Sequence, residues 1–184
     1  MEIQEENAVI ARIQAGDVQK FEHLVKNYQE PLFRFVANLA GHSNVEDLVQ
    51  DIFVSAFSHL DTFDPDRASF RTWIYRIARN RVLNEKKKRR EILFADAPER
   101  ATGRTPSDDL LEKEAFERLD EAFGRLPFRE RVIFVMAEIE GLSYKQIARV
   151  ENLALGTVKS RLFRAKERLR KAFDEYHKRI DDHG

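Results

Sequence analysis

The sequence predicts an all-α protein of two small helical domains joined by a flexible linker, the second domain carrying a helix-turn-helix. Three observations indicate this fold class. Apolar residues recur at helical spacing on both sides of a central stretch, Glu91–Ser107, which has no such periodicity and contains Pro98 and Pro106. A short capped helix followed by a long basic helix occupies Gly141–Phe173. The expected division is a first domain over 1–90, a linker over 91–107 and a second domain over 108–184.

Composition narrows the class of protein. The 184 residues include 32 Lys and Arg and 32 Asp and Glu, so the formal net charge of zero does not point to a nucleic-acid partner. The charges are nevertheless segregated, with acids at Glu2–Glu6 and Glu46–Asp51 and bases at Lys86–Arg90 and in the final helix. There are no cysteines, which excludes disulfides, thiolate metal sites and a cysteine nucleophile.

Several kinds of site and location find no support in the sequence. No apolar run is long enough to cross a bilayer, and Met1–Glu6 is acidic where a signal peptide would be basic, so we expect a cytoplasmic protein without membrane insertion. The five histidines are scattered, and no glycine-rich phosphate loop, nucleophile elbow or HExxH motif is present. We therefore expect no enzyme activity, no cofactor and no metal site.

The first predicted helix is capped by Asp17. Its apolar face carries Phe21, Leu24, Val25 and Tyr28. Pro31 fits poorly in a helix interior, so we expect it to kink this helix or to begin a new one. The apolar surface continues as far as Gly41, which ends it.

The next helix is predicted from Val45 to about Leu60, with a capping box of Ser43 and Glu46 at its start. Its core face comprises Val45, Leu48, Val49, Ile52, Phe53, Ala56, Phe57 and Leu60. Its polar side shows Glu46, Asp47, Gln50 and Asp51. Acids in a first turn complement the helix dipole, but they would equally form a docking patch for a basic partner helix. The sequence alone supports both interpretations.

A loop, Asp61–Ser69, leads to the following helix, Phe70–Arg90, because the Asp64-Pro65 pair disfavours helix. The apolar stripe of this helix comprises Phe70, Trp73, Ile74 and Ile77, and it is continued by Asn80 and Asn84. Such amides either complete a buried hydrogen-bond network or meet a ligand. Aromatic rings and amides beside a basic run, Lys86–Arg90, suit stacking on unpaired bases with phosphate contacts around them. We therefore favour nucleic acid over a packed core helix with a basic end.

The second domain begins with a predicted helix, Asp108–Arg125, which Ser107 caps and Pro127 ends. Another helix, Phe128–Glu140, leads into the helix-turn-helix. The residues after Phe173 are expected to be frayed.

The helix-turn-helix is predicted as a short helix, Tyr144–Val150, a turn over 151–156 and a long helix from Thr157. Ser143 and Gln146 form a capping box for the short helix. The long helix has one apolar stripe, made of Val158, Leu162, Ala165, Leu169 and Phe173, and cations cover its other faces. Four polar residues at its start lie where a recognition helix meets base edges and phosphates: Thr157, Ser160, Arg161 and Arg164. The alternative is a solvated basic face on an ordinary bundle helix.

In combination these motifs resemble the small, two-domain extracytoplasmic-function group of bacterial RNA polymerase sigma factors, from about Asp17 to Ala172. The family's polymerase-docking helix resembles VEDLVQDIFVSAFSHLDTF, and its promoter-melting helix resembles FRTWIYRIARNRVLNEKKKRR. Its promoter-reading helix-turn-helix resembles LPFRERVIFVMAEIEGLSYKQIA followed by GTVKSRLFRAKERLR. Two features depart from the family's pattern: the linker has little acidic run, and Leu155 stands where a small polar cap is common.

The resemblance implies roles for particular residues. Docking on the basic clamp helices of the polymerase largest subunit would use Asp47, Gln50 and Asp51. Capture and melting of the minus-ten element would use the loop from Phe63 to Phe70 together with Trp73, Asn80, Asn84, Lys86 and Lys87. Binding of the minus-thirty-five element would use Thr157, Lys159, Ser160, Arg161 and Arg164.

The function so implied is promoter-specific transcription initiation by a dissociable polymerase subunit under the control of an anti-sigma factor. Two other functions compete with it. A dimeric helix-turn-helix regulator would leave the first domain without a role, and a helical protein-binding adaptor would leave the cations of Lys159–Lys171 unexplained.

Overall fold

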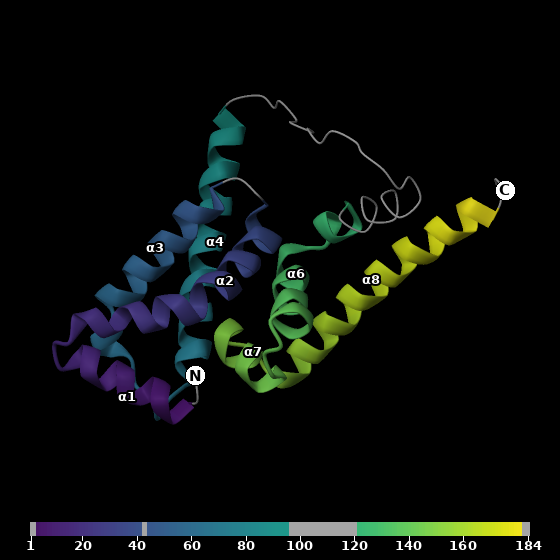
Figure 1. Ribbon diagram of the computed structural model, residues 1–184. Helices are drawn as coiled ribbons and strands as arrows, with labels where there is room; N and C mark the ends of the chain where they lie inside the picture. Colours follow the sequence, from purple (N-terminus) through teal and green to yellow (C-terminus); the bar gives the residue numbers. More distant parts are fainter. Residues whose placement is uncertain (1–2, 42–43, 96–120, 182–184) are drawn as a thin grey trace.

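The structure is a computed structural model that describes residues 3–41, 44–95 and 121–181. The all-α prediction is confirmed, because every regular element in these ranges is a helix. The first domain contains α1 (Ile3–Gln14), η1 (Val18–Lys20), α2 (Phe21–Ala40), α3 (Val45–Ser58), η2 (Leu60–Thr62) and α4 (Phe70–Ala95). The second contains α6 (Phe128–Phe134), a π-helical turn η3 (Val135–Ile139), α7 (Tyr144–Glu151) and α8 (Leu155–Asp181). Figure 1 shows the order of the elements along the chain.

The first domain is a bundle in which α2, α3 and α4 surround a core of large apolar side chains. The central members of this core are fully buried, and they are Leu24, Leu32, Phe35, Ile52, Phe70 and Ile74. Helix α1, which the sequence analysis did not predict, adds Ile10 and Ile13 to the same core. Helix α2 runs through Pro31 as one helix, so the proline does not begin a new one. Burial of Leu32 and Phe35 just beyond the proline offsets a cost of about 3 kcal/mol for proline in a helix interior.

Two predicted boundaries of the first domain differ from the structure. Helix α3 begins at Val45 as predicted, but its N-cap is Asn44 in the left-handed conformation without a side-chain cap, and Ser43 lies outside the described residues. Helix α4 begins at Phe70 as predicted and continues to Ala95, five residues into the segment that we expected to be linker. The rest of that segment, and the predicted helix 108–125 up to residue 120, lie outside the described residues.

The second domain forms a helix-turn-helix, α7 and α8, that packs on α6. The predicted capping box is present. The backbone N–H of Gln146 donates to Ser143 Oγ at 3.3 Å, and the backbone N–H of Ser143 donates to Gln146 Oε1 at 2.9 Å. The turn is shorter than predicted, since Asn152 ends α7 in the left-handed conformation and α8 begins at Leu155. Helix α8 then extends to Asp181, through the residues that we expected to be frayed.

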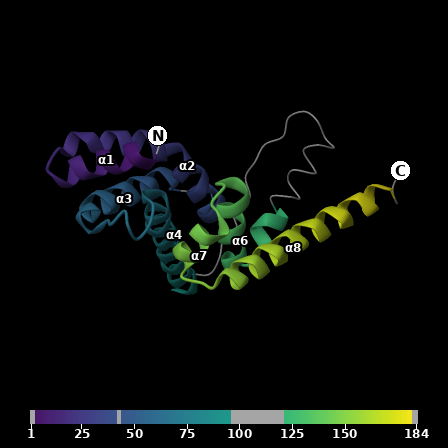
Figure 2. The same ribbon diagram turned by 90° about the horizontal axis from the view of Figure 1, so that it is seen from below.

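The two domains pack against each other. Helix α4 contacts α7, and α2 contacts both α6 and η3, so that one cluster of buried apolar side chains spans both domains. Figures 1 and 2 both show α7 next to α4 and the C-terminal half of α8 projecting away from the bundle. In the described parts of the chain, no helix is both long and apolar enough to cross a membrane.

Candidate nucleic-acid interface

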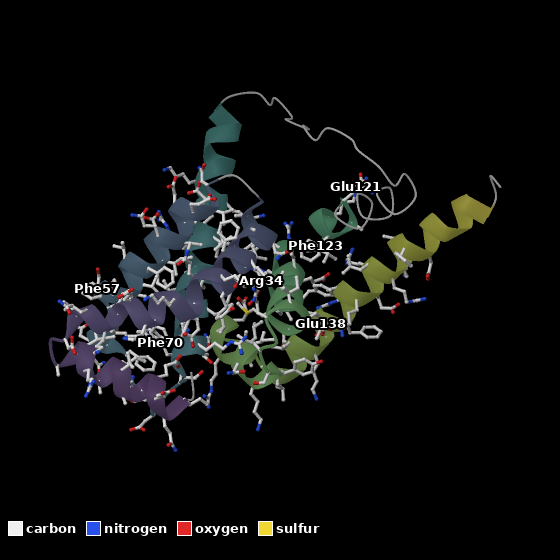
Figure 3. The ribbon with its side chains drawn as sticks, in the orientation of Figure 1. Arg34, Phe57, Phe70, Glu121, Phe123 and Glu138 are labelled. Carbon is white, nitrogen blue, oxygen red and sulfur yellow. The ribbon has the colours of Figure 1, made fainter. Side chains whose placement is uncertain are left out.

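An aromatic cluster lies where the loop 61–69 enters α4. The ring of Phe63 packs edge-on against Phe70 and Trp73, with centroid separations of 5.6 and 5.5 Å. Phe63 and Phe70 are buried and Trp73 is half-buried, and Phe70 lies among the N-terminal helices (Figure 3). The structure therefore places the rings of Phe63 and Phe70 beneath the loop rather than on its outer surface.

The loop itself presents polar groups to solvent. The backbone N–H of Asp66 donates to Asp64 Oδ1 at 3.0 Å, and Arg67 pairs with Asp64 at 3.2 Å. Ser69 caps α4, because its Oγ accepts from the Thr72 backbone N–H at 3.3 Å. These local bonds give the segment between the two buried phenylalanines a defined turn.

Asn80 and Asn84 are both exposed, so neither completes a buried network. They lie along a groove of about 480 Å³ between α3 and α4. The groove is also lined by Asp51, Val54, Ser55, Ser58, His59, Ile77 and Arg81. This half-polar groove lies on the face of α4 that carries Ile77, and Trp73 lies one turn earlier on α4, outside the groove lining.

The two lysines that we assigned to promoter melting are in different surroundings. Lys86 is half-buried, and its Nζ lies 4.9 Å from the centre of the Phe128 ring in the second domain, a cation–π distance. Lys87 is exposed. Only Lys87 therefore faces solvent in this arrangement of the domains.

Another face of α4 is occupied by the second domain. The Arg79 guanidinium makes two hydrogen bonds to the Glu151 carboxylate, at 2.8 and 3.2 Å, and Arg76 donates to the carbonyl oxygen of Arg149 at 2.8 Å. Arg71 donates to the carbonyl oxygen of Glu140. Three arginines of α4 thus contact protein, and sequence periodicity could not have shown this because the partners are about 70 residues away.

The acidic residues of α3 divide between two surroundings. Asp47 and Gln50 are exposed, whereas Asp51 forms an ion pair with Arg81 of α4. Gln50 and Glu46 border a groove of about 530 Å³ between α2 and α3. The apolar lining of this groove is Phe21, Val25, Phe33, Val49, Phe53, Val54 and Phe57.

The sequence analysis missed this apolar groove. Phe57 was predicted to be a core residue, but it is 44% exposed, and its ring contacts Phe21 at the edge of the bundle. Val54 is 59% exposed on the same helix. The available signal was Val54, a large apolar side chain outside the predicted core stripe of α3.

Helix α8 buries one stripe and exposes the predicted recognition residues. Val158, Leu162 and Ala165 are buried. Lys159, Ser160 and Arg164 are exposed, and Thr157 and Arg161 are half-buried. Among the described residues, Lys159 and Arg161 form no ion pair, so both are available to a ligand.

Other cations of α8 are held by carboxylates of the same domain. Arg164 and Arg168 both approach Glu130 of α6, at 3.6 and 3.1 Å. Lys166 pairs with Glu138 at 2.8 Å, which raises the pKa of the Lys166 ammonium. Arg164 therefore has an intramolecular partner that it would have to share with DNA.

An exposed aromatic residue accompanies the polar residues that were predicted to recognise DNA. Phe163 is 65% exposed, although it lies between the buried Leu162 and the exposed Arg164. On a helix it adjoins Lys159 and Ser160, one turn earlier. The sequence analysis did not select it, although an aromatic residue off the apolar stripe of a basic helix was visible.

The described part of the chain holds no group of three or more His, Asp and Glu side chains that could bind a metal ion. Strong pKa shifts belong instead to buried structural groups. Burial, together with hydrogen bonds to Glu6 and Glu140, raises the pKa of Tyr28 and of Tyr75. These phenols lie in the interior and do not form a reactive site.

Comparison with known proteins finds the same division into two parts. The family models described as Sigma-70 region 2 and Sigma-70, region 4 match residues 24–92 and 116–169. The ECF RNA polymerase sigma-E factor of Haemophilus influenzae is 31% identical, over 88% of this chain and 92% of the relative. The factor of the same name from Escherichia coli K12 is 33% identical over 88% of this chain and 91% of its own length.

A solved structure agrees with these matches. The sigma factor RpoE of Bartonella quintana, in its co-crystal structure with the anti-sigma factor NepR, superposes with a TM-score of 0.70 at 26% identity. The similarity covers 85% of this chain and 98% of that one.

Proposed function

The chain belongs to the extracytoplasmic-function RNA polymerase sigma factors of the sigma-70 family, and from this premise we propose which of its surfaces serve each step of initiation. A sigma factor binds core RNA polymerase and promoter DNA and directs transcription initiation, and it is not itself an enzyme. The proposal divides the chain into a polymerase-docking and minus-ten domain at 1–90, a linker at 91–107 and a minus-thirty-five domain at 108–184.

Docking on the basic clamp helices of the polymerase uses the exposed face of α3. Asp47 and Gln50 supply the polar contacts, and the adjacent apolar groove between α2 and α3 supplies the buried area. An acidic edge beside an apolar groove suits an amphipathic helix with a basic flank. Asp51 is paired with Arg81. It contributes to docking either by exchanging Arg81 for a cation of the clamp helices or by staying paired and orienting Arg81.

Minus-ten recognition uses the outward loop 64–69, Trp73, and the groove between α3 and α4 that Asn80 and Asn84 line. An unpaired base would stack near Trp73, and neighbouring nucleotides would receive hydrogen bonds from the two amides further along α4. Phe63 and Phe70 shape the loop from beneath, and Lys86 and Lys87 meet the phosphates once the domains separate.

Minus-thirty-five recognition uses the first turns of α8. Thr157, Lys159, Ser160 and Arg161 supply donors for base edges and phosphates, with Arg164 shared between DNA and Glu130. We add Phe163, whose exposed ring suits contact with a thymine methyl group. The observation that carries this assignment is that α8 buries Val158, Leu162 and Ala165 while leaving these residues at the surface.

Control by an anti-sigma factor is part of the proposal, supported by the similarity to a sigma factor crystallised with such a partner. The protein would act in the cytoplasm, where bacterial RNA polymerase and DNA are found. Its regulator would compete for the docking or DNA surfaces.

The test is reconstitution of the full-length chain with bacterial core RNA polymerase, followed by run-off transcription from a pool of promoter fragments. We expect co-elution with core polymerase and transcripts that depend on the added chain. A dimeric helix-turn-helix regulator would instead bind duplex DNA without polymerase, and an adaptor would bind neither. Absence of co-elution would rule out the proposed docking surface.

A further inference from the structure

Gln14, the last residue of α1, ties that helix to the turn before the loop 64–69. Its Nε2 donates two hydrogen bonds, to the carbonyl oxygens of Leu60 at 2.8 Å and Phe63 at 3.1 Å. A side-chain amide nitrogen carries two protons, so both are used here. Leu60 begins η2 and Phe63 follows its last residue. The amide of Gln14 therefore bridges the two ends of one short turn.

This turn sets the direction in which the loop leaves the bundle. At Phe63 the backbone changes from the 3-10 turn to an extended conformation, with φ −72° and ψ 130°. The ring of the same residue packs on Trp73 at 5.5 Å, next to the surface proposed to receive an unpaired base. A displaced Phe63 carbonyl would move both the start of the loop and the ring that supports Trp73.

We propose that Gln14 is a positioning residue for minus-ten recognition: it holds Leu60 and Phe63 so that the loop 64–69 keeps the shape that captures an unpaired base. This inference rests on the proposed role of that loop. It assigns a part in base recognition to α1, which lies before the residues 24–92 matched by the Sigma-70 region 2 model. Gln14 itself does not touch DNA in this proposal.

A merely structural role for Gln14 would stabilise α1 without affecting base preference. Two measurements separate these roles, and both use the full-length chain. The variant is Gln14→Leu, which keeps the side-chain bulk but removes the donors. The control is Gln19→Leu, since Gln19 is an exposed glutamine of η1 for which the structure shows no side-chain hydrogen bond. Gln14→Glu, of equal size but without a donor when ionised, replaces the leucine variant if that one fails to fold.

The first measurement is independent of DNA. Trp73 is the only tryptophan, so acrylamide quenching of its fluorescence reports how well the Phe63 turn covers it. We expect Gln14→Leu to increase the quenching constant and Gln19→Leu to leave it unchanged. An unchanged constant in a folded Gln14→Leu protein would show that Gln14 does not hold the turn.

The second measurement is selection of single strands randomised over the minus-ten element by holoenzyme made with each variant. We expect Gln14→Leu to lose about tenfold of the base preference at the captured position, the size of one lost base-specific contact, with core affinity unchanged. Full retention of preference in Gln14→Leu, where the wild type selects a motif, would overturn the inference. If the wild type selects no motif, the proposed loop function itself fails, while the quenching result still decides whether Gln14 holds the turn.

Discussion

Tyr75 of α4 donates a 2.7 Å hydrogen bond to the buried carboxylate of Glu140, which lies 65 residues further along the chain in the other domain. The Glu140 side chain is only 1% exposed, and Arg34 of α2 approaches the same Oε2 at 3.7 Å. In Figure 3, Arg34 lies on the side of α2 that faces the second domain. Glu140 is therefore the polar centre of the contact between the domains.

This contact has a geometric consequence for promoter binding. Two elements centred about 25 base pairs apart on B-DNA are separated by about 85 Å, at 3.4 Å per base pair. With α4 packed on α7, and with α8 beginning soon after α7 ends, the proposed minus-ten and minus-thirty-five surfaces lie too close together to span that distance. Simultaneous binding of both elements therefore requires the contact around Glu140 to open.

Replacing Tyr75 with Phe should loosen the contact. The substitution keeps the ring in the core but leaves a buried carboxylate oxygen without its donor, at a cost of about 1–3 kcal/mol. Small-angle X-ray scattering of the full-length chain should show a larger radius of gyration for Tyr75→Phe. Tyr144→Phe, which changes an exposed tyrosine, is the control. Superimposable scattering curves for Tyr75→Phe and wild type would show that this bond does not hold the domains together.

Limited proteolysis should cut first between the two proposed domains, in the segment 96–107. Because the domains share one apolar cluster, the two fragments should remain associated after cleavage and elute together at low salt. Size-exclusion chromatography of the nicked protein, with mass spectrometry of the fragments, checks this. Early cleavage inside α3 or α8 would argue against the proposed boundaries.

Asp47→Lys should weaken binding to core polymerase, because it places a cation on a surface proposed to face basic clamp helices. Asp47 is the better test than Asp51, whose replacement would also break the ion pair with Arg81. Asp17→Lys, the same charge change at an exposed position outside α3, should bind like wild type. Fluorescence anisotropy at two salt concentrations measures the affinity. Equal losses for both variants would mean that only net charge matters.

Arg161→Ala and Lys171→Ala should have different effects on DNA binding. If Arg161 reads a base edge, its loss should cost about 1–3 kcal/mol of binding and relax preference at particular base pairs. Loss of an exposed lysine that contacts the backbone should weaken all sequences alike and lower the salt slope by about one unit. Selection by holoenzyme from a duplex pool randomised over the minus-thirty-five element separates the two cases. A weakened Arg161→Ala that keeps its base preference would reassign Arg161 to phosphate.

Glu6 should make stability depend on pH. Burial raises the pKa of its carboxyl above the ordinary 4.5, although Tyr28 donates to it at 2.8 Å. An acid with a raised native pKa contributes stability at low pH that is lost as pH rises through that pKa. Glu6→Gln should therefore gain stability relative to wild type at neutral pH, and the gain should shrink as pH falls toward 4.5. Urea unfolding of both proteins at several pH values measures this difference, and a gain that does not vary with pH would contradict it.

The local elements were predictable because their signals are local. The Ser143–Gln146 capping box lies where its residues placed it, and α3 and α4 begin where apolar periodicity placed them. Helix α1 was missed because its two core residues, Ile10 and Ile13, are too few to make a stripe. What periodicity cannot provide is the partner of each outward side chain.

The basic side chains of the candidate site show most clearly that periodicity does not reveal the partner of a side chain. Arg79 lies on the helix that was predicted to meet unpaired bases, but its charge is matched by Glu151 from a distant helix. Arg164 likewise shares Glu130 with Arg168. The apolar groove beside Gln50 was also missed, because a hollow between α2 and α3 depends on how two helices pack and not on either sequence alone.

Because η3 is a π-helical turn, the number of residues in Val135–Ile139 matters as much as their identity. Its wide ring is closed by the Glu140 N–H donating to the carbonyl oxygen of Val135, five residues earlier. Deleting one residue there would restore α-helical spacing and rotate everything that follows by about 100° relative to α6. Glu140 would then point away from Tyr75, and α7 away from α4. The length of the segment Val135–Ile139 is therefore a condition for the docking of the two domains.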